Sequence, residues 1–106
     1  MLFRMLSIAA PLLWAPGGEI FGDIRVGETY LVDAPVQLKC GDEIVKGTTD
    51  KEGSFRLAAK STGRCVVSVM YEKATPSVEV VLFDKPARYR LVVEKTKDGS
   101  YILKRV

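Results

Sequence analysis

The chain has 106 residues, with 16 basic and 13 acidic side chains, a formal net charge of +3 and a hydrophobic share of 47%. This length accommodates one domain, and the hydrophobic share excludes a disordered chain. The positive charge is too weak to indicate a nucleic-acid partner, and we expect none.

Two residue types are missing, and their absence removes whole classes of chemistry. The chain contains no histidine, the commonest general base and metal ligand, and no asparagine, the acceptor of N-glycosylation. The serines therefore have no histidine to activate them. We predict that the protein is not an enzyme and has neither a cofactor nor a metal site.

The N-terminal segment has the pattern of a signal peptide. A positive start at residues 1–4 precedes about eleven mostly apolar residues, 5–15. A transmembrane helix needs ~20 such residues, so we expect no span in the mature chain. We predict cleavage after Ala15 or Gly17, which leaves a domain at residues 18–106 in the periplasm or outside the cell. The alternative is an amphipathic helix or an uncleaved anchor.

From residue 19 onward, apolar and polar side chains alternate with a period of two, which is typical of strands. Glycine, proline and aspartate turn signals separate the runs, and no later stretch keeps an apolar stripe at helical spacing. This pattern predicts seven to eight short strands in an all-β, antiparallel β-sandwich. The alternating runs are residues 20–26, 36–40, 55–59, 65–71, 78–82, 89–93 and 101–103.

Cys40 and Cys65 each fall on the apolar side of such a run. Two inward thiols in an exported chain indicate a structural disulfide, which leaves no cysteine ligands for zinc. We expect the bridge to join neighbouring strands and to link the layers of the sandwich from inside. Closing a loop of roughly 25 residues stabilises the fold by ~3.5 kcal/mol in the loop-entropy model.

Four motifs then follow one another along the chain: GEIFGDIR at 18–25, APVQL at 34–38, TDKEGSFRL at 49–57 and GRCVVSV at 63–69. Together they resemble the carboxypeptidase regulatory-like domain over roughly residues 18–83. The resemblance implies a seven-stranded Greek-key sandwich of the transthyretin (prealbumin) type, usually extracellular or periplasmic. It also implies membership of a group of carbohydrate-binding-like folds.

The third motif predicts a structural turn. Asp50 can accept a hydrogen bond from a backbone N–H two residues on, and Gly53 supplies the left-handed conformation of a chain reversal. Phe55 then points into the core. A calcium site would recruit Asp50 and Glu52, but calcium prefers about six to eight oxygen ligands.

The resemblance brings no catalytic activity with it. Transthyretin-like hydrolases depend on histidines and a Tyr-Arg-Gly-Ser ending, whereas this chain ends at residues 103–106 with Leu-Lys-Arg-Val. Metallocarboxypeptidases bind zinc through histidines of a separate domain. Pilin-type sandwiches join a lysine to an asparagine, and here the first strand carries Arg25. An inward lysine bonded to an aspartate is the remaining form of that reaction.

Aromatic and basic side chains supply the candidate binding patch. Phe21 and Phe83 fall on outward faces beside strand ends, Tyr30 is a further aromatic candidate, and Arg88 and Arg90 point outward together. One interpretation is a surface for an anionic partner. The other is a solvated edge whose charges oppose aggregation between strands, with the phenylalanines packed against the terminal hairpin.

We therefore expect a monomeric, non-catalytic exported module that acts as a protein-interaction domain or as a structural or accessory domain of the cell envelope. The alternative is a carbohydrate-binding module of the envelope. The partner, protein or glycan, is not identified by the sequence. One shared patch of Phe21, Tyr30 and Phe83 would favour the protein role, and a groove with stacked tyrosines and a carboxylate would favour the glycan role.

Overall fold

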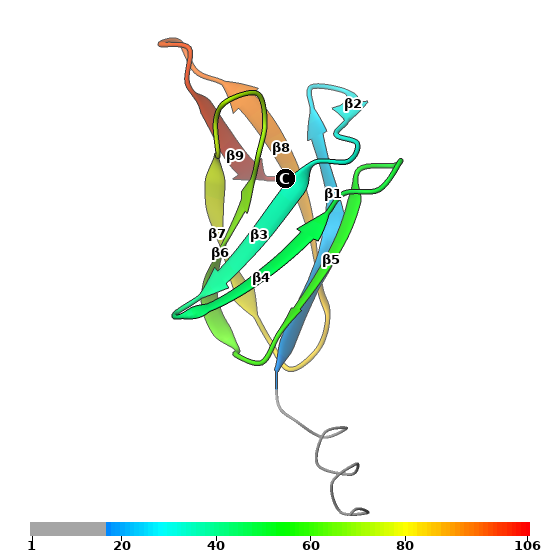
Figure 1. Ribbon diagram of the computed structural model, residues 1–106, viewed down its shortest axis with the longest axis vertical. Helices are drawn as coiled ribbons and strands as arrows, with labels where there is room; N and C mark the ends of the chain where they lie inside the picture. The colour runs from blue at the N-terminus through cyan, green and yellow to red at the C-terminus, as the bar shows by residue number, and fades with distance from the viewer. Residues whose placement is uncertain (1–16) are drawn as a thin grey trace, which may run out of the picture.

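The computed structural model describes residues 17–106, which form two packed β-sheets (Figure 1). The predicted signal peptide at residues 1–17 lies outside the described residues except for Gly17. The strands within this range are β1 (Gly18–Val26), β2 (Thr29–Tyr30), β3 (Pro35–Cys40), β4 (Glu43–Thr48), β5 (Ser54–Ala59), β6 (Gly63–Val69), β7 (Ser77–Leu82), β8 (Ala87–Lys95) and β9 (Tyr101–Arg105).

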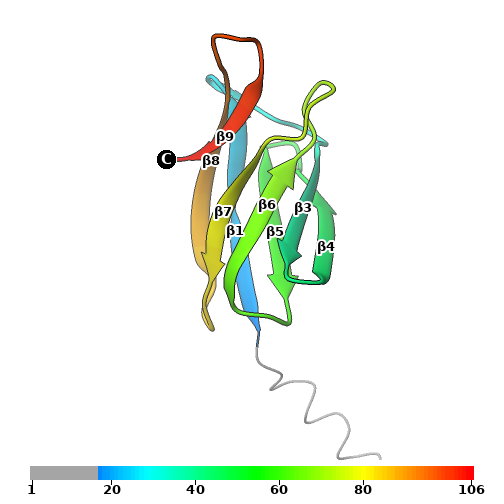
Figure 2. The ribbon, with the colours of Figure 1, turned by 90° about the vertical axis from the view of Figure 1, so that its left-hand side faces the viewer.

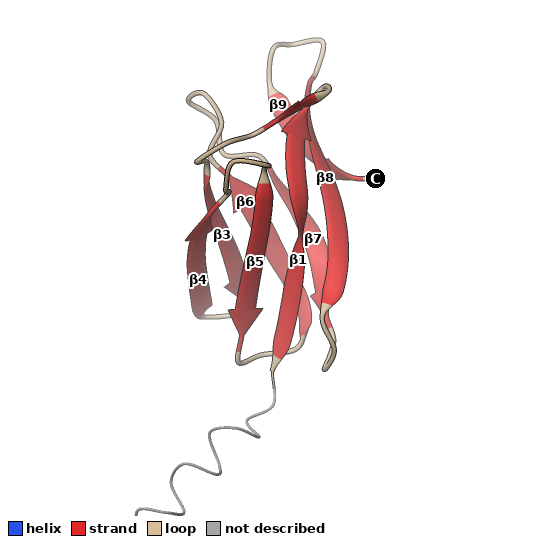
Figure 3. Ribbon diagram, turned by 90° about the vertical axis from the view of Figure 1, so that its right-hand side faces the viewer, coloured by secondary structure: helices blue, strands red, loops and turns tan. Residues whose placement is uncertain are grey.

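The first sheet has the order β2-β1-β8-β9, with β5 also paired to β1, and the second has the order β4-β3-β6-β7. Figure 3 shows the two layers, with β1, β5 and β8 in front. The predicted all-β fold of two layered sheets is confirmed. The pairing is not entirely antiparallel, because β1 and β8 run parallel. Alternation marks the faces of a strand but not its direction, so the sequence did not indicate this pair.

Nine strands form in residues 17–106, against the seven or eight predicted. The two-residue β2 is too short to carry an alternating pattern. The strand β4 was missed for a different reason, because its inward positions include Gly47 while Ile44 is exposed. Because a glycine faces inward and an isoleucine faces solvent, β4 lacks the alternation of apolar and polar residues on which the prediction depended.

The core lies between the inner faces of the two sheets. Ile20, Leu38, Val67 and Leu91 are completely buried there. Burying a large aliphatic side chain of this kind contributes about 1.5–3 kcal/mol, so the core is the main source of stability. Phe55 is also buried in this core.

Thr49 is the buried polar side chain of the described residues, with 1% of its surface exposed. Its hydroxyl accepts a hydrogen bond from the Ala34 N–H at 2.8 Å and donates one to the Leu31 carbonyl at 2.6 Å. These bonds satisfy backbone groups in the connection between β2 and β3, where no neighbouring strand is available to do so.

The edge strands of the two sheets lie against each other. β4 packs beside β5 on one side. On the other side β7 packs beside β9 (Figure 2). Pairing between β8 and β9 stops at Leu91 with Arg105, so the start of β8 extends beyond β9. There the Tyr89 hydroxyl accepts a hydrogen bond from the Val81 N–H and donates one to the Val81 carbonyl. This hydroxyl satisfies two backbone groups at the edge of β7.

Cys40 and Cys65 form the predicted disulfide, with their Cα atoms 4.5 Å apart. The bridge joins β3 and β6, which are neighbours, as expected. It does not link the two layers of the sandwich, because β3 and β6 belong to the same sheet. Both cysteines face the core, and an inward direction alone does not distinguish a partner beside a strand from one across the core.

Candidate functional site

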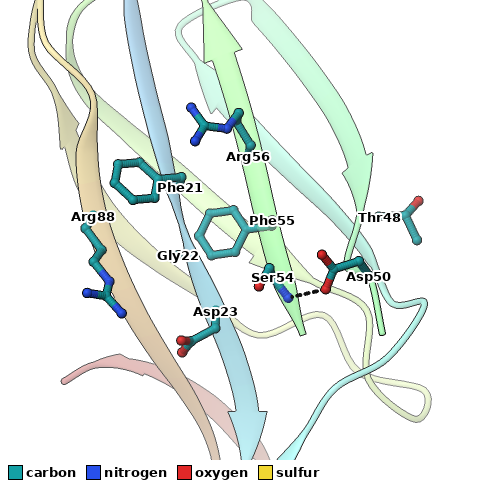
Figure 4. A pocket seen from close by; sticks show the side chains of 9 residues that line it. All are labelled: Phe21, Gly22, Asp23, Thr48, Asp50, Ser54, Phe55, Arg56 and Arg88. Carbon is teal, nitrogen blue, oxygen red and sulfur yellow. Dashed lines mark hydrogen bonds between the residues drawn. The ribbon is translucent and has the colours of Figure 1, made fainter. Parts of the chain in front are cut away.

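An open groove of about 500 Å³ lies on the outer face of the first sheet, across β5, β1 and β8 (Figure 4). Strand β1 contributes the centre of the groove, and β5 and β8 contribute its two sides. The turn between β4 and β5 closes one end. The side chains that give the groove its chemical character are Phe21, Asp23, Asp50, Ser54, Arg56 and Arg88.

Strand register places an aromatic ring between two arginines. Phe21 of β1 is paired with Arg56 of β5 on one side and with Arg88 of β8 on the other. The Arg56 guanidinium carbon lies 5.0 Å from the centre of the Phe21 ring, within the range of a cation–π contact. Arg56 also donates a hydrogen bond to the Glu19 carboxylate at 2.6 Å, so its charge is already paired.

Arg88 differs from Arg56 because its charge is not paired. Within residues 17–106 no salt bridge involves Arg88, and its side chain is exposed. Its guanidinium carries five N–H donors in a planar fork that matches a carboxylate. The groove therefore holds one uncommitted cationic group beside an aromatic ring.

The next set of cross-strand neighbours on this face has an acidic residue on the central strand, β1. Asp23 is paired in register with Ser54 and with Arg90. The Arg90 Nε atom lies 3.9 Å from Asp23 Oδ2, which is a long ion pair, and 17% of the Asp23 side chain is exposed. This row adds a carboxylate and a hydroxyl to the groove one step beyond Phe21.

Asp50 organises the turn at the end of the groove. Its Oδ1 atom accepts hydrogen bonds from the Glu52 N–H at 2.8 Å and the Ser54 N–H at 2.9 Å. Gly53 has a φ of 73°, which favours glycine, and Ile24 O lies only 2.7 Å from where a Cβ would be. The turn therefore fixes Asp50 while leaving its second carboxylate oxygen toward the groove without a protein hydrogen bond in the described part of the chain.

The residues of the predicted patch do not all meet. Phe21 and Arg88 line the groove, and Arg90 lies in the next row beside Asp23. Tyr30 is 45% exposed and pairs with Arg25 at the far end of β1. Phe83 is 56% exposed and directly follows β7. It lies near Gly18, at the opposite end of β1 from Arg25.

Residues 18 and 25 are separated by roughly 23 Å along a strand of ~3.3 Å per residue, so Tyr30 and Phe83 lie far apart. The single aromatic patch that would favour a protein partner is therefore absent from residues 17–106. The groove also lacks the stacked tyrosines that would favour a glycan, although it has carboxylates beside a phenylalanine.

Sequence reasoning missed the groove residues Asp23, Ser54 and Arg56 as a group. Their outward direction follows from alternation. Their proximity depends on the register of three strands that are distant in the sequence, and a pattern within one strand carries no such information.

No internal lysine bond finds support in the described residues. Every lysine of residues 17–106 is exposed, and Thr49 alone is a buried polar residue there. The same residues contain no group of three or more acidic or cysteine side chains placed to hold a metal ion. They also contain no helix that is long and apolar enough to cross a membrane.

Two further carboxylates are held by hydrogen bonds outside the groove. The backbone N–H of Lys60, together with the hydroxyl and backbone N–H of Ser61, lowers the pKa of Glu43 and ties β4 to the loop after β5. The Thr96 hydroxyl and the Ser100 N–H lower the pKa of Asp98 in the β8–β9 turn. Both groups serve to hold loops in place.

Two comparisons with known proteins give no match. No protein-family model matches the chain, and a search of curated proteins finds no match. The resemblance to the carboxypeptidase regulatory-like domain therefore depends on the four motifs alone.

Proposed function

We propose that this protein is a non-catalytic binding module, a protein-interaction or accessory domain of the cell envelope, that engages its partner through the groove across β5, β1 and β8. The observation that carries this proposal is the unpaired guanidinium of Arg88 beside the ring of Phe21. Exposed arginine and aromatic groups on a rigid face are the usual anchors of a binding surface.

The arrangement of the sheets supports a contact through a face. Because β4 packs against β5 and β7 against β9, a partner strand has little free edge to extend. The Tyr89 hydroxyl occupies the backbone N–H and carbonyl of Val81 at the edge of β7. For the same reason we propose that the module acts as a monomer.

The proposal places the protein outside the cytoplasm, as a carboxypeptidase regulatory-like domain with Greek-key, transthyretin-like topology. The Cys40–Cys65 disulfide supports this location, because disulfides persist mainly in oxidising compartments. The four motifs and the signal-peptide pattern of the N-terminal segment support it from the sequence.

A carbohydrate partner is the second candidate. The composition of the groove favours it, because Asp23, Asp50 and Ser54 offer acceptors and a hydroxyl beside an aromatic ring. Such mixtures of an apolar surface with a few convergent polar groups are typical of small-ligand sites.

Capture of partners by the mature chain tests the proposed role. Arg88→Glu reverses the unpaired charge of the groove, and Lys46→Glu makes the same charge change at an exposed position of β4, in the other sheet. We expect one defined envelope component, protein or glycan, to be retained by the wild type and by Lys46→Glu and lost by Arg88→Glu. Equal retention by all three chains would place the contact elsewhere.

A further inference from the structure

We propose that the groove across β5, β1 and β8 binds an acidic saccharide, a pyranose ring that carries one carboxylate, as in a hexuronic acid. This inference deepens the carbohydrate candidate and depends on the groove being the binding surface. It is carried by three features of the groove: one free guanidinium, one partly exposed aromatic ring, and two carboxylates, that of Asp23 on the central strand β1 and that of Asp50 in the turn between β4 and β5.

The guanidinium of Arg88 selects a carboxylate. Arg56 is paired with Glu19, and Arg90 approaches Asp23, whereas Arg88 has no ionic partner within residues 17–106. Its exposed planar fork can hold a carboxylate through two parallel hydrogen bonds, which are stronger than bonds between neutral groups. Because the groove has one such free group, it fits a ligand with one carboxylate at this point.

The ring of Phe21 lies directly beside this group. Register places Phe21 and Arg88 next to each other on adjacent strands, and Arg56 holds the ring from the β5 side at 5.0 Å. A pyranose presents an apolar face of C–H groups that can pack on such a ring while its substituents stay at the rim. A carboxylate on the saccharide ring then falls near Arg88.

The acidic side of the groove distinguishes a saccharide from an acidic peptide. Asp23 and Asp50 would repel the repeated carboxylates of an acidic peptide segment. They accept hydrogen bonds, however, and sugar hydroxyls are donors. The Oδ1 atom of Asp50 already accepts two backbone N–H groups, which leaves Oδ2 for a ligand. Several hydroxyl donors together with one carboxylate are properties of an acidic sugar.

The test measures binding of short oligosaccharides that carry one galacturonic or one glucuronic acid residue among neutral sugars to the isotope-labelled mature chain, by NMR titration and calorimetry. Each acid is compared with its carboxyl-reduced, neutral counterpart, and a glutamate-rich peptide provides the acidic control. The variants are Arg88→Gln, Arg88→Lys and, as a matched control in the other sheet, Lys46→Gln. Thermal melts establish that each variant is folded.

We expect an oligosaccharide with a single uronic acid to shift resonances of β1, β5 and β8 and the neutral sugar to leave them unchanged. Arg88→Gln should weaken binding by about tenfold or more, because it removes a charge-assisted hydrogen bond. The affinity of Arg88→Lys should lie between those of the wild type and Arg88→Gln, since lysine keeps the charge but lacks the planar fork. Lys46→Gln should bind as the wild type does.

Three results would overturn the inference: no binding of either single-uronate oligosaccharide, equal binding of the neutral sugars, or tighter binding of the glutamate-rich peptide. If these results accompany Arg88-dependent capture of an envelope protein, the saccharide is wrong and the proposed interaction role stands. If the capture is also independent of Arg88, both proposals fail. The wild-type resonance shifts locate the site even where a variant does not fold.

Discussion

The hydroxyl of Tyr89 bonds both backbone groups of Val81, accepting from its N–H at 3.0 Å and donating to its carbonyl at 3.1 Å. Tyr89 lies in β8 of one sheet and Val81 in β7 of the other. One phenol thus takes the place of a neighbouring strand where β9 has ended. The contact holds the sheets together and covers an otherwise open edge.

Tyr89→Phe should lower the free energy of unfolding by about 1–2 kcal/mol, because it leaves two backbone groups of Val81 without a protein partner. Urea unfolding measures the change. Tyr101→Phe is the matched control, since the described contacts of Tyr101 are made by its ring, edge-on to Tyr71 at 5.0 Å. Equal losses in the two variants would show that the Tyr89 hydroxyl contributes nothing particular to β7.

Removal of the disulfide should destabilise the fold through the unfolded state. The bridge closes a separation of 25 residues, for which the loop-entropy model gives ~3.5 kcal/mol. We expect this loss in the Cys40→Ala/Cys65→Ala double variant and in the reduced wild type, measured by urea unfolding. Reductant should have no further effect on the double variant. A reduced wild type as stable as the oxidised form would contradict the prediction.

Thr49→Val should cost roughly 1–3 kcal/mol, because the Ala34 N–H and the Leu31 carbonyl both lose their partner in a buried position. Its neighbour Thr48 is exposed, so Thr48→Val should change stability by less than about 0.5 kcal/mol. Thermal unfolding of the two variants separates the effect of burial from the effect of replacing a threonine by a valine. If Thr49→Val were as stable as Thr48→Val, the two hydrogen bonds would have no net effect.

Glu43 should make stability depend on acid. Its folded-state pKa lies below the ordinary value of 4.5, so the stabilisation is complete above that pH and is lost as the pH falls through the lowered pKa. We expect Glu43→Gln to be less stable than the wild type at neutral pH and the difference to shrink as the pH falls below about 4.5. Melting temperatures across this range measure the effect.

Glu52→Gln serves as the control, because this exposed carboxylate forms no side-chain hydrogen bond in the described structure. Its melting temperature should follow that of the wild type at every pH. The pKa of Asp98 is also lowered in the folded protein, so the stability of Glu43→Gln should still depend on acid to some extent. A constant gap between Glu43→Gln and the wild type at all pH values would rule out the linkage.

The sequence indicated those features that depend on neighbours along the chain. Alternation identified the inward direction of Phe55 and of both cysteines, because side-chain direction repeats every two residues. The parallel pairing of β1 with β8 was not accessible, since it joins residues 20–26 to residues 87–93. The row Arg56, Phe21, Arg88 follows from that pairing, so the candidate site could be found only after the register was known.

The β1–β8 pair also governs when folding can be completed. Strand β1 is central to its sheet, yet its partner β8 is synthesised much later. Ile20 of β1 pairs with Ala87 of β8, about 67 residues further along the chain. Contacts of such long sequence separation form slowly, because a large loop must close before they stabilise anything. A ribosome must therefore synthesise β8 before this sheet can assemble. Until then one side of β1 has no strand to satisfy its backbone hydrogen bonds.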